Sequence, residues 1–350
     1  MTVTRAGFLA VGFGALPGED YFGRRQGITW TSADGMSWLE MVDPSLEFVT
    51  PLRIAARGND AYMLGLLATC PQIFEDPCPE TPEAGNGIWR SIAGGAWERL
   101  PVPPEMQLGL IDAITFVGDQ LIVTGSAGDE LQTSTVWRSA DGASWSATSE
   151  VGGLDPVSAI GAGPSGLVAF GTSFVAEFEH NLVTAATSPE GATFTPAVVP
   201  EVFDAAISSI VAGSNGLVAV GYGETDSLAL VAIALHSVDG LAWAQATSSD
   251  GSFDDGGLVE VHALDAGYFA IGFEPDPDDF LIQTGATWYS TDGLTWQSHI
   301  LLDGTFTQFS ASALGPGGLV IFTADQEEFD DETVNSVINA WFAPTAALIP

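Results

Sequence analysis

Carboxylates are the most abundant side chains in this sequence that could carry out chemistry. The segments Glu274–Asp279 and Asp325–Glu332 each concentrate several of them in a short stretch. Because Ca²⁺ takes roughly six to eight oxygen ligands, both segments supply candidate calcium ligands, and we expect no other cofactor. A third segment, Asp250–Gly256, resembles a calcium loop, but its glycine and Glu260 do not have EF-hand spacing. The candidate metal ligands are Asp276, Asp278, Asp279, Asp330 and Asp331.

Cysteine and histidine offer little metal chemistry. Cys70 and Cys78 are the only cysteines and lie in the long, proline-containing loop 69–87. We favour a disulfide across this loop over two free thiols, and a disulfide indicates an oxidising compartment. Two sulfurs without a nearby histidine are too few ligands for zinc. The histidines lack ligand spacing and are predicted to be ordinary surface or strand residues, namely His180, His236, His262 and His299.

The charge balance excludes several classes of partner. The 350 residues include 45 Asp and Glu, eight Arg and no Lys, which gives a formal net charge of -37. Such a field repels phosphate backbones and anionic lipid surfaces, so nucleic acids and membrane surfaces are not expected partners. The 46% of hydrophobic residues predicts a folded chain with a large core. No apolar run approaches the roughly 18 to 20 residues of a membrane-spanning helix.

An internal repeat positions all of these residues. The motif Ser-x-Asp-Gly-x-x-Trp recurs in full and weaker copies, whose closing aromatic residues lie 48 to 59 residues apart. A second phrase, represented by Gly216–Gly221, occurs seven times. A regular period of this length indicates a repeat architecture, here with seven units. The motif residues are Ser32, Asp34, Gly35, Trp38, Ser139, Asp141, Gly142, Trp145, Asp239, Gly240, Trp243, Ser290, Asp292, Gly293 and Trp296.

Each repeat predicts four short strands. In the fifth repeat the apolar runs 206–212, 217–222, 230–236 and 241–246 are separated by turn residues, and Asp-Gly is a strong hairpin signal. We therefore predict an all-β fold, a seven-bladed β-propeller of four-stranded antiparallel blades in one domain. The first blade is expected to have a missing or very short innermost strand. The predicted repeats are approximately 1–42, 43–101, 102–149, 150–199, 200–248, 249–301 and 302–350.

The motif resembles the Asp-box, or BNR-like, repeat of sialidase-superfamily propellers, usually Ser-x-Asp-x-Gly-x-x-Trp, although the version here is one residue shorter. The resemblance implies a propeller with the motif on the turn between the third and fourth strands, opposite the ligand face. It therefore implies a fold more than a chemistry. Sialidases of this superfamily hold the substrate carboxylate with three arginines from well-separated blades. Here no arginine follows Arg138, so we expect no sialidase activity.

The carboxylates are predicted to crowd one face. Loops after the second strands and between blades lie on the same side of a propeller, and together they hold 31 of the 45 acids. Three interpretations remain open: a solvated surface, an electrostatic site for a cationic protein or peptide, and divalent-cation binding. A packing role for the repeated tryptophans is favoured over sugar stacking, so a glycan stays a second candidate partner.

The innermost strands are expected to bring polar residues to the mouth of the central channel. Asp112 and Arg53 of the adjacent blade are predicted to form a polar floor or a structural ion pair. The candidate binding residues are Arg53, Asp112, Ser158, Ser208, Glu260 beside Val259, and Ser310.

We therefore expect a monomeric, non-catalytic binding or assembly module with an acidic ligand face, located outside the cell or in its envelope. The alternative is a glycoside hydrolase or lyase that uses carboxylates at the channel mouth.

Overall fold

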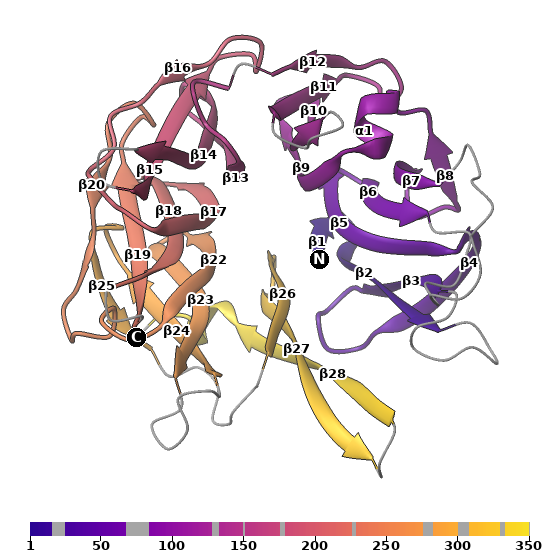
Figure 1. The fold of residues 1–350 in the computed structure, drawn as a ribbon. Coiled ribbons are helices and arrows are strands. Elements are labelled where there is room, and N and C mark those ends of the chain that lie inside the picture. The colour runs from indigo at the N-terminus through magenta and orange to yellow at the C-terminus, as the bar shows by residue number, and fades with distance from the viewer. Residues whose placement is uncertain are drawn as a thin grey trace. The chain divides into compact units, whose positions relative to one another are not determined.

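The computed structural model describes residues 1–15, 25–67, 84–127, 133–149, 151–175, 179–225, 229–275, 283–299, 308–329 and 333–349. Strands make up nearly all of its regular structure (Figure 1). The chain divides into two compact units, Met1–Ser149 and Glu150–Pro350, which are described separately. None of the helices in the described ranges is long and apolar enough to cross a membrane.

The first unit contains three antiparallel sheets, each with its four strands in sequence order. The first comprises β1 (Thr2–Thr4), β2 (Gly7–Ala15), β3 (Arg25–Ser32) and β4 (Leu39–Glu47). The second comprises β5 (Val49–Arg57), β6 (Asp60–Leu67), β7 (Gly85–Ser91) and β8 (Trp97–Leu100). After the short helix α1 (Pro104–Leu108), the third comprises β9 (Leu110–Val117), β10 (Gln120–Ala127), β11 (Thr133–Ser139) and β12 (Ser146–Thr148).

The second unit contains four sheets with the same order. The fourth and fifth sheets comprise β13 (Val157–Gly163), β14 (Gly166–Val175), β15 (His180–Ser188) and β16 (Thr195–Pro196), then β17 (Ala205–Gly213), β18 (Gly216–Glu224), β19 (Leu230–Ser237) and β20 (Ala244–Gln245). The sixth comprises β22 (Gly257–Leu264), β23 (Gly267–Pro275), β24 (Gln283–Ser290) and β25 (Thr295–Ser298), with β21 (Thr247–Ser248) added in parallel beside β25. The described part of the seventh comprises β26 (Gln308–Gly315), β27 (Gly318–Phe329) and β28 (Thr333–Pro344), followed by the turn η1 (Thr345–Ala347).

These seven sheets confirm the predicted fold class, because the chain is a seven-bladed β-propeller of antiparallel blades. The first blade does have an innermost strand, β1, but it is only three residues long, as the repeat indicated. Sheets 1 to 7 are called blades 1 to 7 below.

The core lies between the faces of neighbouring blades. In blades 2 to 6 at least half of the second strand is buried, as in β18, where residues Leu217–Gly221 are all buried. This explains why the second phrase is apolar without alternation, since both faces of the strand are covered. Phe170 of blade 4 meets Trp243 of blade 5 edge to face, with ring centroids 4.8 Å apart. Each such side chain contributes about 1.5 to 3 kcal/mol by leaving water.

The Ser-x-Asp-Gly-x-x-Trp motif folds as a turn held by its own side chains. In blade 6 the Ser290 Oγ accepts the Gly293 N–H at 2.8 Å, and Asp292 Oδ1 accepts the N–H groups of Leu294 and Thr295 at 2.8 Å each. The Trp296 indole N–H donates to the Gly293 carbonyl at 3.1 Å. Gly293 has φ +78°, a left-handed conformation that favours glycine. The serine and the tryptophan of the motif therefore each satisfy one backbone group of a tight turn, the aspartate satisfies two, and the glycine adopts the left-handed conformation.

Candidate functional site

The first strands of six blades carry the same irregularity. In blades 2 to 7 one residue of the first strand is left without a cross-strand partner, which is a β-bulge. A bulge re-aims the side chains around it and is common near functional sites. The unpaired residues are Leu52, Asp112, Ser158, Ser208, Val259 and Ser310.

A glycine on the second strand makes room for most of these bulges. In blade 5 a Cβ at Gly221 would lie 1.9 Å from the Ala206 carbonyl oxygen, and in blade 6 a Cβ at Gly272 would lie 1.9 Å from the Gly257 carbonyl oxygen. The second phrase of the repeat ends in glycine because a bulged carbonyl occupies the space of a side chain. In blade 7 the corresponding position is Thr323.

The predicted binding residues therefore coincide with the bulges, with two departures. In blade 2 the unpaired residue is Leu52, one position before the predicted Arg53. In blade 6 it is Val259, and the predicted Glu260 follows it directly. First strands of neighbouring blades contact one another within each unit, β5 with β9 in the first, and β13 with β17, β17 with β22 and β22 with β26 in the second.

In the first unit, Arg53 and Asp112 act on each other without a direct ion pair among the described residues. The Arg53 guanidinium instead donates to the Leu52 carbonyl at 2.9 Å. Partial burial raises the pKa of the Asp112 carboxyl, and the Arg53 charge opposes that rise. The two groups are thus coupled through space, and the polar floor expected of them stays a prediction.

In the second unit, three polar side chains meet across blades 6 and 7. Ser312 on β26 donates its hydroxyl to Glu260 Oε2 at 2.8 Å, and its backbone N–H lies 3.2 Å from the same oxygen. His262 Nε2 lies 2.6 Å from Ser312 Oγ and 3.8 Å from Glu260 Oε1. Glu260 and His262 are two positions apart on β22, so they share one face of the strand. We call this group the Glu260 cluster.

The Glu260 cluster holds a carboxylate without activating a nucleophile. Burial lowers the pKa of His262, and the Glu260 charge only partly offsets this, so the imidazole is neutral at neutral pH. Because the Ser312 hydroxyl donates to Glu260, its oxygen can accept a hydrogen bond from His262 Nε2–H. The network therefore assigns the serine as a donor to the carboxylate. Ser312 itself is only 3% exposed, which further argues against nucleophilic catalysis.

Glu260 is the accessible member of the cluster. Its side chain is 29% exposed, against 13% for His262. Its Oε1 atom accepts no hydrogen bond from any described residue, whereas Oε2 accepts two. Residues 150–350 contain no Lys or Arg, so no permanent cation of this unit neutralises Glu260. The result is a fixed, partly exposed negative charge with one oxygen available.

The remaining predicted residues are separate from this cluster. Ser158 Oγ lies 3.4 Å from the Phe170 carbonyl oxygen, and Ser208 and Ser310 are exposed on their bulges. The candidate metal ligands Asp276, Asp278, Asp279, Asp330 and Asp331, and the predicted Cys70–Cys78 disulfide, lie outside the described residues. Within the described ranges, no group of three or more His, Cys, Asp or Glu side chains is placed to hold a metal ion.

Sequence reasoning missed His262 and Ser312. His262 was predicted to be an ordinary surface or strand residue, and Ser312 was not singled out. Side chains two positions apart on a strand lie on the same face, so the sequence alone could have placed Glu260 and His262 together. His262 and Ser312 are 50 positions apart in the sequence and lie in two different sheets, so no local sequence pattern predicts their contact.

Comparisons with known proteins find similar structures and no matching family. No protein-family model matches the chain, and no curated protein matches it in sequence. A protein of unknown function from Dyadobacter fermentans has a similar structure, with TM-score 0.50, 14% identity, and coverage of 84% of this chain and 94% of that one.

Two further structures are more distant. The propeller domain of the Trilobed protease from Pyrococcus furiosus has TM-score 0.49, 10% identity and 85% coverage of each chain. A Trypanosoma rangeli sialidase in complex with sialic acid has TM-score 0.42 and 11% identity, and the match covers 98% of this chain but 53% of the sialidase. At these identities the likeness concerns the fold alone, and the class that the structure defines is the seven-bladed β-propeller.

Proposed function

We propose that this chain is a non-catalytic binding module that holds a cationic group of a protein or peptide at Glu260. The observation that carries the proposal is the Glu260 carboxylate, fixed through Oε2 by two hydrogen bonds from Ser312 and open at Oε1. A charge-assisted bond from a guanidinium or ammonium group to such an oxygen is stronger than a neutral hydrogen bond. Because the carboxylate is already oriented, the Glu260 side chain has less ordering entropy to lose when a ligand binds.

The surrounding charge favours the same class of ligand. The unit that contains Glu260 has no Lys or Arg, so its field attracts cations and accelerates their association. A neutral His262 adds no positive charge that would compete for the carboxylate. The acidic loops predicted on the ligand face belong to this proposal, as does an exported or envelope location, which rests on the predicted Cys70–Cys78 disulfide.

We further propose that the motif turns are Asp-box repeats of the sialidase-superfamily type. The support is the paired use of Ser290 and Asp292 to hold the backbone of one turn, repeated by Ser139 and Asp141 in blade 3. These turns have a structural role in the proposal, and ligand binding is assigned to the bulged first strands.

Calorimetry with a synthetic peptide of alternating arginine and glycine tests the function. The control ligand is the same peptide with citrulline, which keeps the shape of arginine and removes its charge. We expect Glu260→Gln to weaken binding of the arginine peptide by about tenfold, equivalent to about 1.4 kcal/mol. Asp265→Asn, an exposed substitution with the same charge change on the turn between β22 and β23, should weaken it by less than about twofold.

Two results would contradict the proposal. If Glu260→Gln and Asp265→Asn weaken binding equally, the effect is one of bulk charge, and Glu260 is not the site. If the wild-type protein hydrolyses glycans and either Asp112→Asn or Glu260→Gln abolishes that turnover, the protein is an enzyme and the non-catalytic assignment is wrong.

A further inference from the structure

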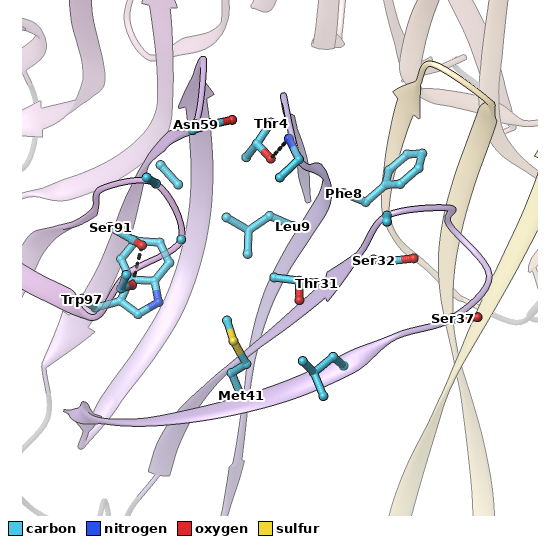
Figure 2. A pocket seen from close by; sticks show the side chains of 17 residues that line it. Thr4, Phe8, Leu9, Thr31, Ser32, Ser37, Met41, Asn59, Ser91 and Trp97 are labelled. Atoms are coloured by element: carbon cyan, nitrogen blue, oxygen red, sulfur yellow. Dashed lines mark hydrogen bonds between the residues drawn. The ribbon is translucent and has the colours of Figure 1, made fainter.

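A cavity of about 450 Å³ lies in the first unit between blades 1 and 2 (Figure 2). This volume is within the usual range of small-molecule sites, roughly 300 to 1,000 Å³. Its walls come from β1 to β4 on one side and from β6, β8 and the turn 91–97 on the other. It belongs to a different unit from the Glu260 cluster and has a different chemistry.

The cavity exists because one turn departs from the repeat. In three other blades the turn glycine packs on the preceding blade, and a Cβ there would lie 2.7 Å from Leu100 Cδ1 at Gly142, 2.8 Å from Val168 Cγ2 at Gly240 and 2.7 Å from Val218 Cγ2 at Gly293. At Gly94, the equivalent position of blade 2, nothing lies within 4 Å. The gap that a turn seals at those three junctions is open between blades 1 and 2.

The open turn lacks the aspartate of the motif. Ala93 stands in its place, so no carboxylate gathers the following N–H groups. The hydroxyl of Ser91 then donates to the Gly95 carbonyl at 2.6 Å, whereas the serines of the full motif accept from the turn glycine. Ala93 has φ +51°, a left-handed conformation that is unfavourable for a residue with a Cβ. The altered motif sequence of this turn therefore leaves the cavity open.

The lining is apolar and uncharged. Phe8, Leu9 and Trp97 are buried, with 3%, 7% and 5% exposure, and Met41 lies beside them in the wall (Figure 2). None of the 17 lining residues carries a charge, although the chain as a whole has a net charge of -37. An ion entering this space would lose hydration without gaining a partner, so the lining selects against charged ligands.

Three polar side-chain groups are available to orient a ligand. Within the described residues, the Thr31 hydroxyl, the Asn59 side-chain amide and the Trp97 indole N–H make no hydrogen bond. The other labelled hydroxyl groups are engaged, namely those of Thr4, Ser32, Ser37 and Ser91. Figure 2 shows Thr31 beside Leu9 and Asn59 beside Thr4. A mostly apolar pocket with a few well-placed polar groups is the usual form of a small-molecule site.

We propose that this cavity binds a small uncharged molecule. Its hydrocarbon ring or chain lies against Leu9, Met41 and Trp97, and its hydroxyl or carbonyl group bonds to Thr31 or Asn59. The site operates independently of Glu260 and recognises a ligand by shape and hydrogen bonding without charge.

Three probes with one hydrocarbon skeleton test the selectivity. These are 4-isopropylbenzyl alcohol, 4-isopropylbenzoate and 4-isopropylbenzylamine, which differ in charge at one end. Fluorine NMR of the full chain labelled with 5-fluorotryptophan reports on Trp97, whose resonance is assigned by its loss in Trp97→Phe. We expect the alcohol to shift the Trp97 resonance saturably and to bind at least about tenfold more tightly than either ion.

Matched variants locate the binding. Ala61→Phe places a ring in the cavity and should abolish the shift, whereas Ala143→Phe, at an exposed turn position, should leave it unchanged. Thr31→Val keeps the side-chain shape and should weaken binding of the alcohol by at least about threefold if the hydroxyl is used. Asn59→Ala is the parallel variant.

Several outcomes would overturn the proposal. These are equal binding of the three probes, no movement of the Trp97 resonance at the solubility limit of the alcohol, or a saturable shift that persists in Ala61→Phe. Loss of binding only when both Thr31 and Asn59 are changed would support it. Glu260→Gln should leave this readout unchanged, so failure here is distinguishable from failure of the proposed function.

Discussion

The Cα of Gly221 on β18 faces the Ala206 carbonyl oxygen on β17, and a Cβ on that glycine would lie 1.9 Å from the oxygen. The close approach occurs directly beside the bulge at Ser208. The bulge therefore depends on the glycine, because the extra residue on the first strand fits only where the second strand presents no side chain. The same relation recurs in blade 6 between Gly272 and Gly257.

Gly221→Ala should destabilise the protein through this contact. Adding a methyl group to a closely packed site forces backbone shifts, which typically cost about 1 to 3 kcal/mol. Urea unfolding monitored by tryptophan fluorescence measures the change. The control is Gly317→Ala, where a Cβ would meet only Phe342 Cζ at 3.8 Å. A loss at Gly221 no larger than at Gly317 would show that β17 adjusts freely and that the bulge is not fixed by the glycine.

The fold was predictable because its information is local and repeated. Each copy of the motif closes one hairpin with its own side chains, as Ser290 and Asp292 do, so one turn can be inferred from a short window. The seven copies of the second phrase then determine the number of blades. Most of the residues predicted for the channel mouth lie on bulges, which the repeat alone did not predict, and in blade 2 the unpaired residue is Leu52, one position before Arg53.

The sites were harder to predict because they depend on contacts between blades. Ser312 meets Glu260 from the next sheet, 52 positions away, and the sequence contains no signal for that pairing. The cavity depends on the open space beside Gly94, where a Cβ would have no atom within 4 Å. The missing aspartate at Ala93 was visible as a weaker motif, but its effect on the space between two sheets is a property of packing.

Acid should destabilise the motif turns. Burial tends to raise the pKa of Asp292, but the backbone N–H groups of Thr295 and Leu294 more than offset this, so its folded pKa is depressed. The folded state therefore favours the ionised carboxyl, and this stabilisation is present above about pH 4 and is lost as the pH falls through the depressed folded pKa.

Asp292→Asn should reduce that pH dependence. The urea midpoint of the wild type should fall more steeply below about pH 4 than the midpoint of the variant, because the neutral amide has no proton to bind. Asp265→Asn, on an exposed turn of the same blade, should keep the wild-type slope. Parallel curves for wild type and Asp292→Asn would mean that the charge of this carboxylate does not stabilise the turn.

His262 should report directly on Glu260. Burial holds the pKa of His262 below its usual value of about 6.5, and the Glu260 charge raises it partway back. Since the unfolded state then binds the proton more readily, the protein should lose stability as the pH falls below about 6.5, until the folded pKa is passed.

Glu260→Gln should lower the pKa of His262 further. Proton NMR titration of the imidazole measures it, with His262→Asn to assign the resonance. Asp265→Asn removes the same charge from the turn between β22 and β23 and should leave the titration unchanged. A pKa that rises in Glu260→Gln would contradict the assigned network, because it would mean that the carboxylate stabilises the neutral imidazole.

Ser312→Ala tests how much the hydrogen bonds of the Ser312 hydroxyl stabilise the protein. The hydroxyl bonds both Glu260 and His262, and its loss leaves buried polar groups with fewer partners, which costs about 1 to 3 kcal/mol. Ser208→Ala is the matched control, because the Ser208 side chain is exposed and makes no hydrogen bond within the described residues. This substitution should change the free energy of unfolding by less than about 0.5 kcal/mol.

Ser312→Ala should also weaken binding of the arginine peptide, although the charge of Glu260 stays in place, because the carboxylate is no longer held in one orientation. Calorimetry on the folded variant checks this, and unchanged affinity would show that orientation by Ser312 contributes nothing to binding.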